Sequence, residues 1–441
     1  MSLEFSANWE LLQDGPPEER ACFAAIGILA DNVSLAEAED LIVRRTRSEN
    51  YLSAYRLGEW LAWNWWRLRW EPYTRAPDWA MAHRLATIGG GFVWPNITIV
   101  SDGEEVRVVA KPTEPREAEP VRYIADFVAT VPAVEFEGAV ASLVEQVIDR
   151  LQSETVPETN LERIWRDVRE EISSPEIAFR RRLEALLGFD PEEAPAGLVG
   201  TYLSDGEDLG TAAVDELAAL CAGGKEWLTG EIIHEIANAL GIESNLNDGI
   251  ETLATICIAK VEQQSSVLSA WQRGAEFAHV IRDQEQLGAS PISNQRLADW
   301  TGIQTNFLTR KSSSTEKLAF ALQGANGRAQ IVFRSKWETG RRFELARLLG
   351  DRIARTPSDR LFPATHGRTY RQKFQRSFAA ELLCPFEALD DMLAGDFSDE
   401  KQDEVANYFS VSPITVRTLL VNHGRIDRHE LELEADLYGP M

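Results

Sequence analysis

The pattern of apolar and polar positions predicts a chain built mainly of helices. Residues 1 to about 87 are expected to be helical, and Ser34-Leu-Ala-Glu resembles a capping box ahead of an apolar periodic run. This first helical region is expected to end near Gly89-Gly90-Gly91, where three glycines in a row disfavour a helix.

A β-hairpin is predicted after the glycines. The segments 96–101 and 104–110 are short and rich in β-branched residues, and they flank Asp102-Gly103, a pair that favours a tight hairpin turn. The following stretch from Lys111 to Pro120 holds three prolines and no apolar periodicity, so it is expected to be a connector.

Helical spacing returns from about 121 to 265. Ser174 and Pro175 are expected to be the N-cap and the first-turn proline of one helix, which Gly188 ends. The pattern as a whole predicts a predominantly helical α+β protein with three regions. They are an N-terminal region, 1–120, with a Trp-rich helix and the hairpin, a helical middle region, 121–265, and a C-terminal domain, 266–441.

Composition places the chain among ordinary globular proteins. It has 441 residues, of which 44 % are apolar and 26 % are charged. The N-terminus lacks the apolar run of a signal peptide, and no stretch is long and uncharged enough to span a bilayer. The four cysteines form no Cys-x-x-Cys pair, so no zinc ribbon is indicated. We expect a cytoplasmic protein without a membrane partner.

Charge is unevenly distributed. The net charge of −25 excludes a uniformly basic nucleic-acid binder. Between Arg328 and Arg376, however, thirteen basic residues face four acidic ones, a local net charge of +9. This segment could contact phosphates, an acidic partner or the acidic part of the chain itself. The candidate contact residues are Arg334, Lys336, Arg341, Arg342, Arg347, Arg352, Arg355, Arg368 and Arg371.

Six of the thirteen tryptophans fall between Trp60 and Trp79. Trp60, Trp63, Trp66 or Arg67, and Trp70 share one face at helical spacing, whereas Trp65 points elsewhere. Aromatic rings beside arginines could stack on exposed bases. A core helix is the favoured interpretation, because each large ring buries about 150–250 Å².

His234-Glu235-Ile-Ala-Asn238 resembles the zinc-binding H-E-x-x-H motif, but Asn238 replaces its second histidine. An amide is a poor zinc ligand, so the segment is expected to be the polar face of a helix.

Four sequence blocks follow one another in the C-terminal third. They lie at 270–282, 297–303, 341–346 and 378–385, and the last reads Phe-Ala-Ala-Glu-Leu-Leu-Cys-Pro. Together they resemble the ImmA/IrrE family of zinc endopeptidases. The resemblance implies a compact domain with a short three-stranded sheet over an active-site helix. Apolar runs at 318–322 and 329–333, separated by glycines, agree with a hairpin there.

Where that family has H-E-x-x-H, this chain has Arg347-Leu348-Leu-Gly-Asp351. The resemblance implies that Arg347 and Asp351 stand at two ligand positions, Leu348 at that of the general base and Phe374 at that of a third ligand. A catalytic zinc needs about three protein ligands, and a guanidinium remains protonated. We therefore expect no catalytic residues, no metal and no cofactor, and an ion pair between Arg347 and Asp351 one turn apart.

Histidines elsewhere give little support for a displaced metal site. His366 could join Asp351 and another carboxylate, but a loop histidine without periodic partners is the simpler interpretation. The same holds for His423, His429 and Glu430.

The resemblance implies a function without catalysis. A member of this family that lacks zinc would retain the surface that docks a protein partner, such as a repressor or another regulator, in bacterial stress, phage-defence or mobile-element control. The segment 412–420, with Ser412 as N-cap and Pro413 in the first turn, would form one wall of the docking groove. The alternatives are a nucleic-acid-binding regulator that uses the basic segment and an active zinc endopeptidase with displaced ligands.

Overall fold

The computed structural model describes residues 1–114, 120–224, 226–246, 255–259, 268–310, 318–324, 328–354 and 359–426. It has about 52 % helix and 16 % strand, which confirms the predicted α+β class with helix in excess. Within the described ranges, no helix combines the length and the apolar character that crossing a bilayer requires.

The chain forms two compact units that are interleaved along the sequence. Unit 1 consists of Met1–Leu203 and Cys221–Trp227, and unit 2 consists of Ser204–Leu220 and Leu228–Met441. Helices α8 (Leu198–Leu209) and α9 (Thr211–Cys221) carry the chain from one unit to the other and back. The return segment belongs to unit 1, where Gly223 N donates to Leu187 O and the rings of Phe189 and Trp227 lie 5.9 Å apart.

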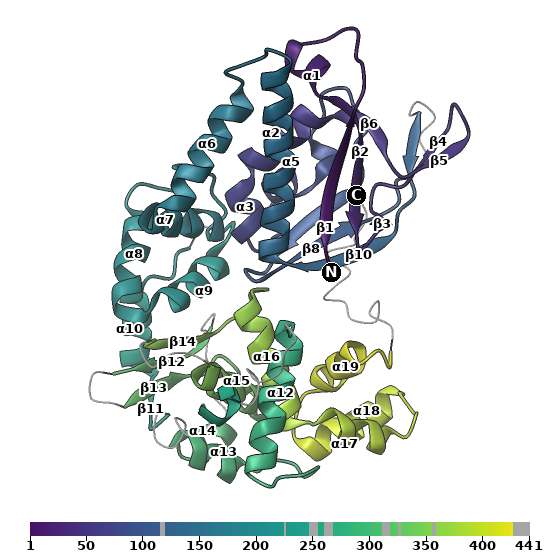
Figure 1. The fold of residues 1–441 in the computed structure, drawn as a ribbon. Helices are drawn as coiled ribbons and strands as arrows, with labels where there is room; N and C mark the ends of the chain where they lie inside the picture. Colours follow the sequence, from purple (N-terminus) through teal and green to yellow (C-terminus); the bar gives the residue numbers. More distant parts are fainter. Residues whose placement is uncertain are drawn as a thin grey trace. The chain divides into compact units, whose positions relative to one another are not determined.

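Three small antiparallel sheets form the strand part of unit 1 (Figure 1). In the first, β2 pairs with β1, β3 and β6; the second has the order β10-β8-β7 and the third β5-β4-β9. The strands are β1 (Leu3–Trp9), β2 (Phe23–Ala30), β3 (Val33–Ser34), β4 (Ala38–Asp40), β5 (Arg45–Arg47), β6 (Asn50–Ser53), β7 (Ile97–Ser101), β8 (Glu105–Ala110), β9 (Val121–Tyr123) and β10 (Phe127–Pro132).

The hairpin predicted at 96–110 is confirmed, because β7 pairs with β8 around Asp102-Gly103. The helices predicted across the first 50 residues are largely wrong. Phe23–Ala30 is a continuous apolar run that forms a buried strand, and periodicity alone does not separate such a run from a buried helix. Ser34 is no helix cap: it ends β3, and its Oγ donates to Ser48 O at 2.9 Å.

The helices of unit 1 share one core with all three sheets. The buried residues of this core range from Leu3 to Ala185, and α5 packs against β1, β8 and β10. As predicted, Pro175 begins a helix with Ser174 as its N-cap residue. The helices are α1 (Pro17–Ala21), α2 (Ala54–Trp63), α3 (Trp65–Trp70), α4 (Pro77–His83), the 3₁₀ turn η1 (Leu85–Thr87), α5 (Ala133–Ser153), α6 (Asn160–Ser173) and α7 (Pro175–Leu186).

Unit 2 contains a four-stranded antiparallel sheet of order β11-β13-β12-β14. Its strands are β11 (Ile242–Ser244), β12 (Ala319–Gln323), β13 (Ala329–Val332) and β14 (Leu361–Ala364). The predicted hairpin is confirmed by the pairing of β12 with β13, whereas its turn residues 325–327 lie outside the described residues. The sheet has one strand more than the resemblance implied. That strand, β11, comes from before the expected boundary at 265.

The helices of unit 2 surround this sheet and a second apolar core. Pro413 begins the last of them after Ser412, as predicted. They are α10 (Gly230–Leu240), α12 (Ala270–Gln284), α13 (Asn294–Thr301), α14 (Asn306–Thr309), α15 (Glu338–Ala354), α16 (Tyr370–Leu383), α17 (Phe386–Leu393), α18 (Asp399–Phe409) and α19 (Pro413–Asn422).

Two glycines let α16 lie very close to its neighbours. Gly274 of α12 faces the backbone of α16, and a Cβ there would lie 2.9 Å from Phe378 N. Gly350 of α15 lies against the ring of Phe378, where an added Cβ would clash with the ring carbons. Helix α12 therefore packs against the backbone of α16, and α15 packs against the ring of Phe378. The close approach of α15 and α16 brings their polar side chains together.

Candidate functional site

The α15–α16 polar site consists of Arg347, Asp351, Arg371 and Gln372, which join the two helices inside unit 2. Thr369 is the N-cap residue of α16. Its Oγ1 accepts a hydrogen bond from Gln372 N at 3.2 Å and donates one to Glu216 Oε2 at 2.8 Å. This cap fixes the first turn of α16, from which Arg371 and Gln372 extend toward α15.

Arg347 is buried, and within the described residues its hydrogen bonds go to neutral groups. Its Nη2 donates to Thr365 O at 2.6 Å and to Gln372 Oε1, and that amide oxygen also accepts from Thr365 N at 2.8 Å. The predicted ion pair between Arg347 and Asp351 is therefore wrong. The local helical spacing is right for such a pair, but both side chains have partners outside α15.

Asp351 pairs with Arg371 instead. Arg371 Nε donates to Oδ1 at 2.8 Å and Nη2 donates to Oδ2 at 2.6 Å, and both side chains are buried. This is the bidentate geometry that makes an arginine–carboxylate pair strong. Burial alone would lower the pKa of Arg371, but the charge and hydrogen bonds of Asp351 outweigh it and raise the pKa above its ordinary value.

Phe374, expected at the third ligand position, does not face this site. Its ring packs edge to face on Phe277 of α12, 5.2 Å between centroids, and is stacked on Phe378 at 6.3 Å. Arg371 and Gln372 make the polar side-chain contacts from α16 to Asp351 and Arg347. Leu348, at the expected position of the base, is fully buried in the apolar core.

The surroundings of Arg347 are electropositive. Burial, followed by the nearby charge of Arg376, lowers the pKa of Arg347 to about 9, so the side chain remains cationic at neutral pH. Arg376 donates to Gly367 O at 2.9 Å, and burial lowers its pKa to about 10. A fixed positive charge thus occupies the place that the resemblance assigns to a metal ion.

His366 lies beside this positive charge. Burial and then the charges of Arg334, Arg376 and Arg347 lower the pKa of His366. These same surroundings disfavour a further cation in this region. His423 stacks on Phe386 with centroids 3.6 Å apart. Among the residues that the structure describes, no three His, Cys, Asp or Glu side chains converge in a way that could hold a metal ion. His429 and Glu430 lie outside the described residues.

Five of the nine basic residues predicted as contact residues are buried inside unit 2. Arg342 donates to Ile292 O at 2.7 Å and to Ser410 O at 3.1 Å, so it ties α15 to two distant loops. Arg341 donates to Phe307 O at 2.7 Å in the same way. The five buried candidates are Arg341, Arg342, Arg347, Arg352 and Arg371.

The exposed candidates lie just before α15. Arg334 and Lys336 are exposed, and between them and the helix stands Trp337 with 69 % of its surface in water. Trp337 was not among the residues predicted from the sequence; a lone tryptophan in a polar stretch before a helix start was the available signal. Arg368 is half-buried, and Arg355 lies outside the described residues.

The tryptophan-rich segment is mainly core, as expected, but the assignment of its faces is wrong. Asn64 interrupts the helix between α2 and α3, and Trp65, predicted to point elsewhere, is buried together with Trp66. Trp65 packs edge to face on Trp165 at 5.3 Å. Trp63, predicted to share the buried face, is 59 % exposed.

His234 lies on the exposed side of α10, where its Nε2 is 2.8 Å from Asp208 Oδ2. This agrees with the expected polar helix face.

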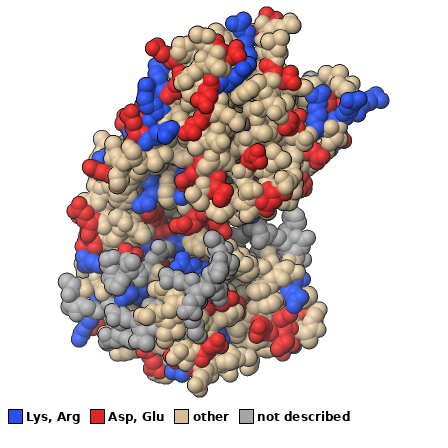
Figure 2. Space-filling model, in the orientation of Figure 1, with Lys and Arg blue, Asp and Glu red and all other residues tan. Residues whose placement is uncertain are grey.

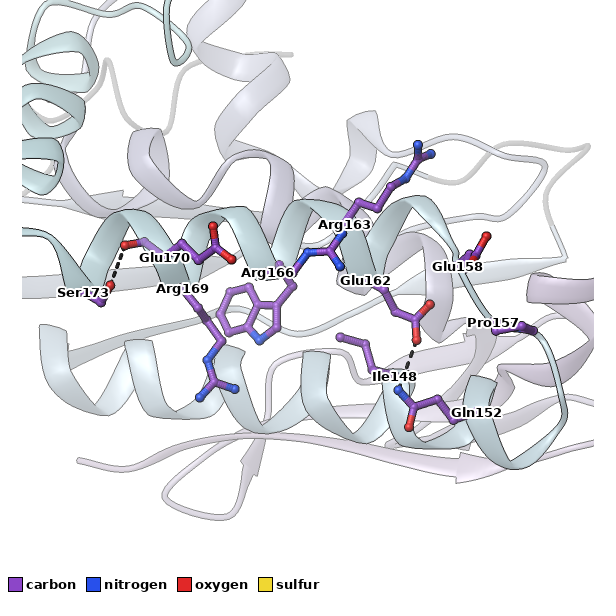
Figure 3. Close-up of a pocket in the computed structure, with 11 residues that line it drawn as sticks. Ile148, Gln152, Pro157, Glu158, Glu162, Arg163, Arg166, Arg169, Glu170 and Ser173 are labelled. Atoms are coloured by element: carbon purple, nitrogen blue, oxygen red, sulfur yellow. Dashed lines mark hydrogen bonds between the residues drawn. The ribbon is translucent and has the colours of Figure 1, made fainter.

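A groove of about 980 Å³ lies between α5 and α6 in unit 1 (Figure 3). Both arginines and glutamates line its α6 side, so the lining offers no uniform charge to a ligand. The charged residues that line it are Glu158, Glu162, Arg163, Arg166, Arg169 and Glu170.

Comparison of the chain with protein-family models, with curated proteins and with solved structures gives no match. Any function must therefore be argued from the α15–α16 polar site and from the exposed surfaces themselves.

Proposed function

We propose that this chain is a catalytically inactive relative of the ImmA/IrrE peptidases that acts by binding a protein partner. The observation that carries the proposal is the buried pair of Asp351 and Arg371. The carboxylate is the one remaining metal-ligand type among the four motif positions, and a guanidinium already occupies both of its oxygens.

Arg347, at the first ligand position of the motif, also supports the loss of metal binding. Hydrogen bonds to Thr365 O and Gln372 hold its cationic group inside unit 2. A divalent ion placed there would meet a positive charge in a medium of low dielectric constant, which is strongly unfavourable. Leu348 offers no group that could accept a proton from water.

The partner surface is the exposed segment Arg334–Trp337. Tryptophan and arginine dominate the binding energy of many protein interfaces, because they combine a large apolar area with hydrogen-bonding groups. Arg334 keeps half of its side chain in water while pairing with Glu344 at 3.5 Å, so it is both held in place and accessible. A regulator with an acidic, partly apolar patch fits this segment. The bacterial setting in stress, phage defence or mobile-element control comes from the resemblance.

The nucleic-acid alternative has less support than a protein partner. Five of its nine candidate cations are buried and engaged within unit 2, so they cannot reach phosphates without unfolding. The peptidase alternative would need ligands other than the four motif residues.

Native mass spectrometry with added zinc tests the loss of catalysis. We expect no retained zinc and no zinc-dependent cleavage of the captured partner. Stoichiometric zinc together with cleavage that a chelator abolishes would overturn the proposal.

Partner binding is tested with Trp337→Ala in the full chain. Once a partner has been captured and purified, this substitution should weaken binding at least about tenfold, as expected for a central aromatic side chain. Trp63→Ala is the matched control, since Trp63 is similarly exposed and lies in unit 1. Equal affinity of Trp337→Ala and wild type would exclude this segment as the docking surface.

A further inference from the structure

The tip of the β4–β5 hairpin exposes three consecutive aliphatic side chains. Leu41 is 44 %, Ile42 77 % and Val43 52 % exposed. Isolated apolar residues on a surface are ordinary, but a run of three at the end of a hairpin costs solubility and is expected only where it has a use.

Hydrogen bonds hold this tip in one conformation. Asp40 Oδ1 accepts from Ile42 N at 3.0 Å and from Val43 N at 2.8 Å, and Arg44 N donates to Asp40 O at 2.7 Å. Arg44 adopts the left-handed region with φ 56°, which closes the turn. The backbone of the tip is therefore already ordered, so binding loses little backbone conformational entropy there.

Cationic side chains follow directly behind the apolar tip. Arg44 and Arg45 are exposed, and neither has an ion pair with any residue in the described ranges. The backbone N–H of Val43 holds the pKa of Asp40 below its ordinary range, and this carboxylate pairs with Arg47 at 2.7 Å. The pair is neutral as a whole, so the tip carries the two charges of Arg44 and Arg45. Figure 2 shows blue side chains gathered over this hairpin.

We infer that the β4–β5 tip inserts into the surface of an anionic lipid bilayer. Its aliphatic side chains would enter the boundary between headgroups and acyl chains, while Arg44 and Arg45 contact anionic headgroups. Tyr51 is half exposed and lies beneath Arg47 at 5.1 Å. Tyrosine is one of the side chains favoured at membrane–water interfaces.

Neither the net charge nor the lack of a spanning helix opposes this inference. Salt screens charges more than about 8 Å apart at physiological ionic strength, so the two local arginines outweigh remote acidic residues at the contact. The expectation of no membrane partner was drawn from the missing spanning segment, and surface insertion needs no such segment.

Co-sedimentation of the full chain with vesicles tests the inference. We expect binding to vesicles of phosphatidylglycerol and phosphatidylcholine in equal parts, weaker binding to phosphatidylcholine alone, and a loss with rising salt. Ile42→Asp should weaken binding to the mixed vesicles by at least about tenfold. Replacing Arg44 and Arg45 by Gln should weaken it by about fivefold per arginine, on anionic vesicles only.

Matched substitutions elsewhere on unit 1 serve as controls. Leu11→Asp changes a similarly exposed aliphatic residue, and Arg166→Gln changes an exposed arginine of α6. Both should bind vesicles like wild type, and unchanged circular dichroism would confirm that all variants are folded. No binding of wild type to either vesicle, or equal binding of Ile42→Asp and wild type, would overturn the inference in favour of an apolar pocket on a protein.

Discussion

Asp351 lies one helical turn after Arg347, yet its carboxylate is bound by Arg371 of the neighbouring helix, with 2.6 Å between Oδ2 and Nη2. The pair therefore links α15 to α16 rather than stabilising one helix internally. Since both side chains are buried, each charge depends on the other for its compensation.

Asp351→Asn should destabilise the protein by about 3–5 kcal/mol, because it leaves the charge of Arg371 buried without a counter-charge. Urea unfolding measures this loss. The control is Asp399→Asn, which breaks an exposed pair with Arg417 and should cost no more than about 1 kcal/mol. Similar small effects of both substitutions would contradict the role given to Asp351.

The lowered pKa of Glu71 leads us to expect that the stability of unit 1 depends on pH. Burial tends to raise its pKa, but hydrogen bonds from His83 Nε2 at 2.9 Å and Arg67 Nε at 2.7 Å outweigh burial and lower the pKa below its ordinary value. A carboxylate whose pKa is lower in the folded than in the unfolded state stabilises the folded protein at pH values above its unfolded-state pKa. That stabilisation is lost as the pH falls through the folded-state pKa.

We therefore expect Glu71→Gln to cost about 3 kcal/mol near neutral pH and less in acid. Unfolding measured from neutral to acidic pH for wild type and variant gives the difference directly. A difference that stays constant as the pH falls would show that the charge of Glu71 does not contribute.

Gly350→Ala should destabilise unit 2 by about 1–3 kcal/mol, because the new methyl group meets the ring of Phe378. Adding Phe378→Leu should recover part of the loss if the two positions are in contact. Gly138→Ala in α5 is the control, since its Cβ would meet open space. That substitution should stabilise by about 0.5–1 kcal/mol through the higher helix propensity of alanine.

Trp65→Ala and Trp63→Ala separate core from surface within the tryptophan-rich segment. The first removes a buried ring packed on Trp165 and should cost about 3–5 kcal/mol. The second removes an exposed ring and should change the free energy of unfolding by no more than about 0.5 kcal/mol. Thermal and denaturant unfolding of the two variants side by side provide the measurement.

Local chemistry made parts of this fold predictable. Asp102-Gly103 specifies a tight turn by itself, and Pro175 and Pro413 fit the first turn of a helix without any tertiary context. The run Phe23–Ala30 was wrongly predicted as helical because a fully buried strand and a buried helix segment show the same apolar pattern.

The α15–α16 polar site was less predictable because it depends on how two helices are rotated about their axes. Helical spacing correctly placed Arg347 and Asp351 on one face of α15, but it holds no information on the residues of α16 that meet them. Phe374 and Gln372 are two residues apart on α16, so the rotation of that helix about its axis decides which of them faces α15.

The interleaving of the two units has a consequence during synthesis. Unit 1 needs Cys221–Trp227, and the ribosome makes Ser204–Leu220, which belongs to unit 2, before that segment. The N-terminal unit therefore completes its own fold only after the first helices of its neighbour have emerged. A nascent chain arrested before Trp227 should remain more sensitive to protease than one arrested a few dozen residues later.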